Sequence, residues 1–364
     1  MHCDLRVAKS ARRITMEQRM VETERGHSLR ELERFASRAG LQVSDSLVED
    51  FFPVHLKNFP PGQPVPFPLY CPLFSPREKK ILFSKILARD NPYNDELREF
   101  FARRSISSAY IHKKDLARLA DYLEQNARTC INSPTMSSER KTQVIYNNAE
   151  FLIERAFRDP DLGHVIDDAT KWSSMVGWFL SENEITPAYL CSIFSKDYTT
   201  FTHSIQVCLL GMAFGAHLKW ESEEIGEFGV GCLFHDLGKI WIDNRILQKP
   251  GILDEQEMKH IRRHPRLGYR HLKEGGLLPP RALAIVLQHH ESLDGGGYPL
   301  GLSKDAIHPL ARATRIVDCY DALTTRRPYK GPLSPFKALK LMHDEMWESF
   351  DLDLLKRFIQ FLGK

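Results

Sequence analysis

From about residue 139 to the C-terminus, the chain is a near-continuous series of segments in which apolar residues recur three or four positions apart. That spacing places the apolar side chains on one face of an α-helix, and short connections make neighbouring helices pack against one another. The series includes "QVIYNNAEFLIERAF", "HVIDDATKWSSMVGWFL", "HSIQVCLLGMAFGAHL" and "EEIGEFGVGCLFHDLGK". We therefore predict a mainly α fold built on a helical bundle.

The preceding region has a different character. Residues 48–75 are aromatic, strand-like and interrupted by proline, and two helical segments with the strand-like "SSAYIH" between them follow. This pattern predicts a small α/β accessory domain over residues 46–132. The run "CINSPTMSSERK" is typical of a linker, and the bundle domain is expected over residues 133–364. Residues 1–45 are expected to form a tail or a peripheral helix.

Composition excludes several classes of protein. The net charge is only +3, so a surface that coats a DNA or RNA polymer is not indicated. No apolar run approaches the ~18 residues that a membrane-spanning helix needs, and the N-terminus lacks the pattern of a secretory signal. The 7 cysteines are scattered singly, which argues against a disulfide framework or a structural zinc knuckle. We therefore expect a cytoplasmic protein.

Histidines are concentrated in the bundle, where 8 of the 15 fall between residues 203 and 290. His235 and Asp236 follow a mostly apolar helix, so an imidazole and a carboxylate are expected to be buried together. A buried carboxylate is costly unless it is paired or binds a cation. A hydrogen-bonded pair that caps the helix is one explanation, and a metal site is the other.

Two further helices carry histidines of the same kind. His264 is expected on a helix that starts at Asp254, where Glu257 completes a capping box. His289 and His290 end a helix that is opened by two prolines. Neighbouring side chains on a helix point about 100° apart, so one ordinary ligand position cannot use both histidines.

The candidate metal ligands share a predicted position on or at the end of an apolar helix. They are His203, His235, Asp236, His264, His289, His290 and Asp318. Each alone is explained as a structural residue, but seven such groups in one buried site make little sense as core. Imidazole and carboxylate suit first-row metals such as Fe, Mn or Zn, and one tetrahedral ion would use only four of them. Seven ligands fit two ions that share a bridging carboxylate, and such a centre is wide enough to receive adjacent histidines.

Other polar residues near these positions have less specific roles. Asp321 lies one turn beyond the last candidate ligand, on the same side of its helix. Glu291 and Asp294 are expected to orient the histidines. His260 and His271 could share a face with a ligand, but they are flanked by charged residues and are interpreted as surface positions. The glycines of "DGGGYP" allow the backbone to turn sharply and approach a ligand.

With these residues in place, the chain resembles the HD-GYP group of the HD phosphohydrolase superfamily. The matching pieces are "DYTTFTHS", "HDLGK", "ILQKPGILDEQE", "HPRLG", "HHESLDGGGYPLGL" and "RIVDCYDALTTRRPYK", in that order. The resemblance covers about residues 150–350 and is specific because six pieces occur together. It implies an HD-type helical bundle and a bacterial cyclic di-GMP phosphodiesterase that opens the cyclic dinucleotide to linear pGpG, and further to GMP in some cases.

The resemblance also implies roles for individual residues. One metal ion is held by His203, His235, Asp236 and Asp318, and the other by Asp236, His264, His289 and His290. Asp236 bridges the two ions, and Lys239 contacts the scissile phosphate, so these two residues are the expected catalytic groups. Substrate is bound by Gly297, Tyr298, Pro299, Arg327 and Lys330, together with Lys239. Iron is the expected metal and manganese the alternative.

One position departs from the family pattern. Some members carry a glutamate one turn before the first histidine, which supports a third metal ion, whereas this chain has Thr199 there. We therefore predict two ions rather than three.

Two other functions are left open by the sequence. One is a cyclic-dinucleotide sensor that turns over slowly and signals through a partner, and the other is a hydrolase of another nucleotide, such as cyclic GMP–AMP. Signalling proteins such as diguanylate cyclases and a second copy of the chain are the partners considered.

Overall fold

The computed structural model describes most of the chain outside its N-terminal segment. The described residues are 43–44, 48–75, 80–158, 162–183, 185–194, 199–247, 249, 251–326 and 331–363. The predicted tail or helix of residues 1–45 lies outside them except for Val43 and Ser44. The chain divides into two compact units, Met1–Asn126 and Ala127–Lys364.

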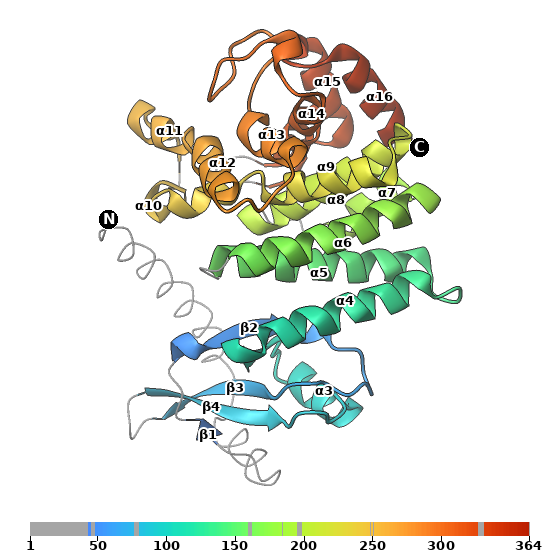
Figure 1. The fold of residues 1–364 in the computed structure, drawn as a ribbon, viewed down its shortest axis with the longest axis vertical. Helices are drawn as coiled ribbons and strands as arrows, with labels where there is room; N and C mark the ends of the chain where they lie inside the picture. The colour runs from blue at the N-terminus through green and yellow to red at the C-terminus, as the bar shows by residue number, and fades with distance from the viewer. Residues whose placement is uncertain are drawn as a thin grey trace. The chain divides into compact units, whose positions relative to one another are not determined.

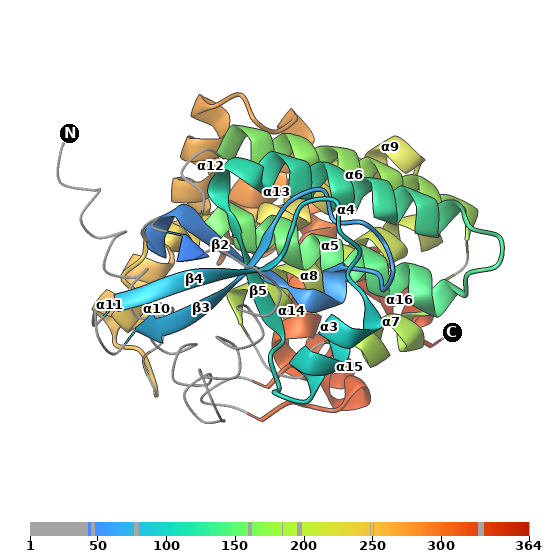
Figure 2. The ribbon, with the colours of Figure 1, turned by 90° about the horizontal axis from the view of Figure 1, so that it is seen from below.

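The first unit contains an antiparallel sheet. Its described strands are β1 (Val43–Ser44), β2 (Phe51–His55), β3 (Leu69–Ser75), β4 (Lys80–Leu87) and β5 (Ser108–His112), in the order β1-β4-β3-β5-β2. Figure 2 shows β3 and β4 side by side. The helix α3 (Asp95–Ala102) and most of α4 (Leu116–Asn132) belong to the same unit. Short 3₁₀ turns stand at Val48–Asp50, Leu56–Asn58 and Lys113–Asp115.

Aromatic side chains fill the core of this unit. Phe51 of β2 stacks on Phe83 of β4, with ring centres 3.9 Å apart. Phe67 and Phe101 are also buried. The strands β2 and β5 and the helices α3 and α4 lie where the sequence predicts them, whereas β4 was not predicted.

The second unit is helical throughout the part that the structure describes. Its longer helices are α5 (Ser138–Arg158), α6 (Leu162–Glu182), α7 (Pro187–Ile193), α8 (Thr200–His217), α9 (Ser222–Phe234), α12 (His264–Glu274), α13 (Pro280–Gln288), α14 (Pro309–Thr324), α15 (Pro335–Asp344) and α16 (Leu352–Leu362). Shorter helices are η4 (Leu237–Trp241), α10 (Asn244–Leu247), α11 (Glu255–Ile261), η5 (Lys304–Ala306) and η6 (Trp347–Ser349). The predicted fold class, a mainly α chain with a small α/β region ahead of the bundle, is confirmed.

The helices α8 and α9 form the centre of the bundle. Every residue of α8 from His203 to Gly215 is buried. A helix that is apolar on all sides must be covered on all sides, and α8 contacts α5, α9 and α14 while α9 contacts α6 and α13 (Figure 1). A polar side chain at the end of either helix is therefore carried into the interior.

Two predicted boundaries are wrong. The capping box of Asp254 and Glu257 is present at the start of α11, but this helix ends at Ile261 and His264 begins the separate helix α12. Pro265 in the first turn of α12 lacks the N–H that a continuous helix requires. In addition, α4 extends to Asn132 into the predicted linker and α5 begins within it, so only residues 133–137 connect them.

No helix in the described part of the chain has the length and apolar character needed to cross a membrane.

Gly238 allows η4 to lie directly against the first turn of α12. A Cβ atom at this position would lie 1.9 Å from the carbonyl oxygen of His264 and 2.7 Å from the nitrogen of Gly268. Both contacts are with backbone, which cannot move aside as a side chain can. The glycine therefore holds the segment that follows α9 against the residue that begins α12.

We expect the substitution Gly238→Ala to lower the free energy of unfolding by about 1–3 kcal/mol, because the two backbones must separate to admit the methyl group. Urea denaturation followed by circular dichroism on metal-free protein measures this change. Gly331→Ala is the matched control, since nothing lies within 4 Å of its Cβ position. Equal midpoints for the two variants would contradict the close packing of η4 on α12.

Candidate metal centre

The seven predicted ligands come from five helices or their ends. His203 lies in the first turn of α8, His235 and Asp236 follow α9, His264 begins α12, His289 and His290 follow α13, and Asp318 lies within α14. Six of the seven are fully buried, and the side chain of His290 is 19% exposed. The bundle therefore brings together groups that are up to 115 positions apart in the sequence.

Asp236 lies between two groups of imidazoles. Its Oδ1 atom is 3.1 Å from Nε2 of His264 and 4.0 Å from Nε2 of His289. Its Oδ2 atom is 3.5 Å from Nε2 of His235 and 3.8 Å from Nε2 of His203. Each oxygen of one carboxylate thus faces a different pair of histidines.

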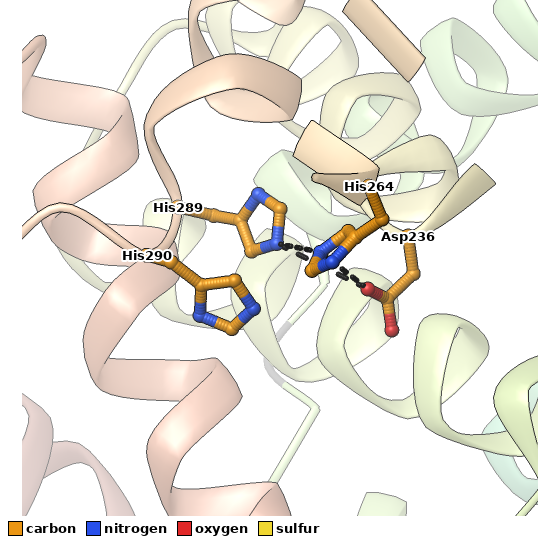
Figure 3. A group of neighbouring side chains, drawn as sticks. All are labelled: Asp236, His264, His289 and His290. Atoms are coloured by element: carbon orange, nitrogen blue, oxygen red, sulfur yellow. Dashed lines mark hydrogen bonds and ion pairs between the residues drawn. The ribbon is translucent and has the colours of Figure 1, made fainter. Parts of the chain in front are cut away.

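The remaining two residues complete the cluster. The carboxylate of Asp318 lies 3.0 Å from Nε2 of His203 and 3.7 Å from Nδ1 of His290. Figure 3 shows the side chains of His264, His289, His290 and Asp236 close together. Two sets of ligand atoms, each within 4.8 Å of one another, have the geometry to hold an ion: Asp236, His264, His289 and His290, and His203, His235 and Asp236. Both sets include Asp236.

Main-chain carbonyls fix the orientation of three imidazoles. His235, His264 and His289 each donate Nδ1–H to the carbonyl oxygen three residues earlier, at 2.6, 2.8 and 3.1 Å. A carbonyl can only accept, so in the neutral form of each ring the lone pair is on Nε2. These lone pairs are the ones that point at Asp236.

In this arrangement the Nε2 lone pairs of the histidines face one another and the carboxylate oxygens of Asp236, and all of these atoms are hydrogen-bond acceptors. Nε2 of His235 is buried and has no hydrogen-bond partner among the described residues. Nε2 of His264 and Nε2 of His289 are 3.2 Å apart, which is unfavourable for two lone pairs unless a positive charge lies beside them. The residues present therefore fit divalent metal ions, which would accept these lone pairs.

The charge states of the cluster suit metal binding. Burial lowers the pKa of His235, and it lowers the pKa of His289 and His290 well below the ordinary value, because a charged imidazole is disfavoured away from water. Burial alone would raise the pKa of Asp236, but Lys239 and His235 help to hold it well below its usual range. Neutral imidazole and ionised carboxylate are the forms that bind a metal.

Lys239 lies beside the central carboxylate. It stands in η4, one turn after Asp236, and its Nζ atom is 2.5 Å from Oδ2 of Asp236. Its side chain is 14% exposed. The structure thus places a cation at the edge of the cluster, with part of its surface open to solvent.

Comparison with known proteins identifies this part of the chain. Residues 193–354 match the protein family described as "HD domain". These residues belong to the HD domain family. A cyclic di-GMP phosphodiesterase of Pseudomonas aeruginosa is 33% identical over 228 residues, which are 62% of this chain and 54% of that protein. A 3′3′-cGAMP-specific phosphodiesterase of Vibrio cholerae is 38% identical over 121 residues, which are 33% of this chain and 26% of that protein.

A solved structure shares the fold of this chain. The structure of an HDG"Y"P protein from Bdellovibrio bacteriovorus covers 86% of this chain and 100% of that chain, with a TM-score of 0.64 and 18% sequence identity. The HD domain match and the cyclic-dinucleotide phosphodiesterases among the relatives agree with the predicted resemblance to the HD-GYP group. The chain spans 54% of the length of the first relative, so the comparison concerns the matched residues rather than the whole of either protein.

One residue that orients a histidine of the HD domain was not given this role by the sequence analysis. Oδ2 of Asp321 lies 2.7 Å from Nδ1 of His203, and both side chains are buried. Thr325 lies one turn further along, with its Oγ1 atom 3.3 Å from the other oxygen of Asp321. Asp321 therefore accepts a hydrogen bond that turns Nε2 of His203 toward the cluster. The helical spacing of "DCYD" is the signal that pointed to it.

The prediction that Glu291 and Asp294 orient the histidines is wrong. The Glu291 carboxylate accepts hydrogen bonds from the main-chain nitrogens of Leu300 and Leu302, at 2.6 and 2.8 Å. Asp294 accepts one from the nitrogen of Gly296 at 2.8 Å. Both carboxylates satisfy main-chain N–H groups in the loop that follows α13, so their role is to fix the loop.

That loop lies against the metal cluster. A Cβ atom on Gly297 would lie 2.3 Å from the nitrogen of Ser292 and 2.5 Å from Cα of Glu291, so only glycine allows this approach. The Tyr298 nitrogen donates to the carbonyl of His290 at 3.1 Å, and the two rings lie 4.6 Å apart. Tyr298 is thereby held at the rim of the cluster. The predicted contacts of residues 297–299 with substrate remain a prediction.

The other predicted residues are not part of the described cluster. Arg327 and Lys330 lie outside the residues that the structure describes, so their predicted contacts with the dinucleotide remain a prediction. His260 is exposed on α11, and His271 stacks on Trp241 with ring centres 3.9 Å apart. The surface interpretation of these two histidines agrees with the structure.

We expect Asp321→Asn to weaken metal retention about 10- to 100-fold. The neutral side-chain amide of asparagine is a weaker acceptor for the His203 ring than the charged carboxylate, so it orients that ring less firmly. Competition with a chelator, followed by metal analysis of the protein, measures this change. Asp167→Asn is the control, since its carboxylate is 69% exposed on α6 and lies outside the cluster. If both variants retain metal as the unchanged protein does, the assigned role of Asp321 is wrong.

Proposed function

We propose that the HD domain of this chain is a metal-dependent phosphodiesterase that opens cyclic di-GMP to linear pGpG. The observation that carries the proposal is the convergence of five imidazoles and the carboxylate of Asp318 with the carboxylate of Asp236, with Lys239 beside them. Metal ions held by this buried set of acceptors would, together with Lys239, neutralise the charge of a phosphodiester, which must happen before a nucleophile can attack it. The relative from Pseudomonas aeruginosa, named a cyclic di-GMP phosphodiesterase, supports this substrate.

Two ions are proposed, with Asp236 as the bridge. His203, His235 and Asp318 hold one ion, and His264, His289 and His290 hold the other, in accord with the two sets of ligand atoms that share Asp236. Bound divalent ions supply Lewis acidity and an activated water at such a centre. We propose iron as the native metal and manganese as the alternative, because both accept mixed imidazole and carboxylate ligands.

A third ion is not proposed. Thr199 occupies the position where some family members carry a glutamate, and its hydroxyl accepts a hydrogen bond from the nitrogen of Thr202 in the capping box of α8. This hydroxyl is a weaker metal ligand than a carboxylate and is already used in the cap.

The chain's own residues have distinct parts in the proposed reaction. Lys239 faces the phosphoryl oxygens, where it stabilises the charge that builds on them, and it donates a proton toward the departing 3′ oxygen. Tyr298 presents its ring and hydroxyl at the rim, where a guanine can lie. Arg327 and Lys330 are proposed to bind the dinucleotide, as the family resemblance implies.

A mixed cyclic dinucleotide is a second candidate substrate. The relative from Vibrio cholerae is named a 3′3′-cGAMP-specific phosphodiesterase and is 38% identical over the matched residues. In the proposed reaction the cluster acts on a phosphate rather than on a base, so it does not distinguish the two substrates. Turnover of cyclic di-GMP, cyclic GMP–AMP and cyclic di-AMP by the same preparation therefore decides between them. A partner protein such as a diguanylate cyclase, and assembly into a homodimer, stay predictions.

We expect protein loaded anaerobically with Fe(II) or Mn(II) to carry two ions per chain and to convert cyclic di-GMP to pGpG. Asp236→Asn should lose bound metal and more than about a hundredfold of activity, because the bridge between the two ions is gone. Metal analysis and chromatography of the products measure both effects. Tight binding without product would instead favour a sensor, and undiminished turnover by the variant would show that Asp236 is not the bridge.

We expect Lys239→Ala to retain both ions and to lower kcat by about 10²–10³, because one group that stabilises the developing charge is removed. The matched control is Lys356→Ala, which removes an exposed lysine on α16. Loss of metal together with activity would show that Lys239 supports the ion site rather than the reaction.

A further inference from the structure

A strongly basic segment passes the rim of the metal cluster. Residues 259–273 contain six lysines and arginines and no acidic residue, and they include His264. This segment forms the end of α11 and nearly all of α12. Because His264 lies in its middle, the positive charge is concentrated beside the proposed site of reaction, where it attracts an anionic ligand.

Arg262 is the member of this segment that meets the loop after α13. Its guanidinium carbon lies 5.3 Å from the centre of the Tyr298 ring, and that ring lies 4.6 Å from the ring of His290. A single aromatic ring therefore connects the guanidinium to the metal cluster. Arg262 is exposed, and none of the ion pairs among the described residues includes it. Its N–H donors are free to bind an anion.

Neighbouring contacts hold Arg262 and Tyr298 in this arrangement. Arg266, one turn further along, donates from Nη2 to the carbonyl oxygen of Pro299 at 2.8 Å. Glu291 accepts two main-chain hydrogen bonds from the far side of the same loop. The loop is thus tied to α12 through Arg266, and its two ends are tied together through Glu291. A binding group that is already in place loses little entropy when a ligand arrives.

The proposed substrate has a second phosphate group that the metal cluster does not bind. A cyclic dinucleotide carries two phosphodiester groups, and only one of them can lie at the ions and Lys239 while it is cleaved. The second is an anion that lies outside the cluster. An arginine side chain suits it, because the planar guanidinium can donate two parallel hydrogen bonds to phosphate oxygens.

We propose that Arg262 binds the phosphate that is not being cleaved, with Tyr298 supporting its guanidinium. This inference rests on the proposed function and adds to it a specificity residue. In a linear dinucleotide the same position takes the terminal phosphate, which carries more negative charge than a diester. Arg262 is therefore a binding residue, and its effect falls on substrates that have a second phosphate.

The test compares a substrate with two phosphates and a substrate with one. Metal-loaded Arg262→Gln and Arg263→Gln are assayed with cyclic di-GMP and with bis(p-nitrophenyl) phosphate, a diester that has a single phosphate. Arg263→Gln is the matched control, because it removes the same charge from the adjacent exposed position, which has no described contact with Tyr298. We expect Arg262→Gln to raise the KM for cyclic di-GMP about tenfold more than it raises the KM for the single-phosphate diester.

Two further measurements complete the test. The Kd of each variant for cyclic di-GMP should change in parallel with KM. Arg262→Lys should recover part of the loss, because it restores the positive charge but not the pair of parallel hydrogen bonds that a guanidinium donates.

Equal effects of Arg262→Gln and Arg263→Gln on the KM for cyclic di-GMP would overturn the inference while leaving the proposed function intact. If the protein binds the dinucleotide without cleaving it, the proposed activity fails, and the Kd of the two variants still decides the role of Arg262. If it neither binds nor cleaves any cyclic dinucleotide, both proposals are overturned.

Discussion

A buried carboxylate that faces the lone pairs of several imidazoles is the constraint on which the rest of this structure depends. Asp236 lies within 4 Å of four histidine nitrogens, and three of those rings are fixed through Nδ1 by main-chain carbonyls. Such a concentration of acceptors is stable only with positive charge among them. Lys239 supplies part of that charge, and divalent ions would supply the remainder.

The bundle is organised to maintain this arrangement. The helix α8 and the second half of α9 are buried on all sides, which carries His203 and the residues that follow Phe234 into the interior. The contact of η4 with α12, which only a glycine at position 238 permits, then brings His264 to the same point. The loop after α13 closes one side of the site through Glu291. Some contacts that pack the bundle, such as that of η4 with α12, therefore also place a candidate ligand.

Several features could be predicted from the sequence because they depend on local spacing. The bundle, the cap at Asp254 and the burial of His235 beside Asp236 follow from residue types at fixed offsets. Other features depended on distant partners. β4 was missed because its sequence "KILFSKIL" does not alternate apolar and polar residues, and pairing with β3 decides its conformation. Glu291 was given the wrong partners because its sequence position beside two histidines does not determine where its carboxylate points.

The sequence by itself determined which chemistry is available: neutral imidazoles and carboxylates on apolar helices, with a lysine one turn past the central aspartate. Only the tertiary structure decided which of these groups meet. It showed that the two oxygens of Asp236 face different pairs of histidines, that Asp321 rather than Glu291 orients a histidine, and that Arg262 lies against Tyr298. The reason is physical. Burial and helical periodicity act over a few residues, whereas the direction of each side chain is set by helices packed from distant parts of the chain.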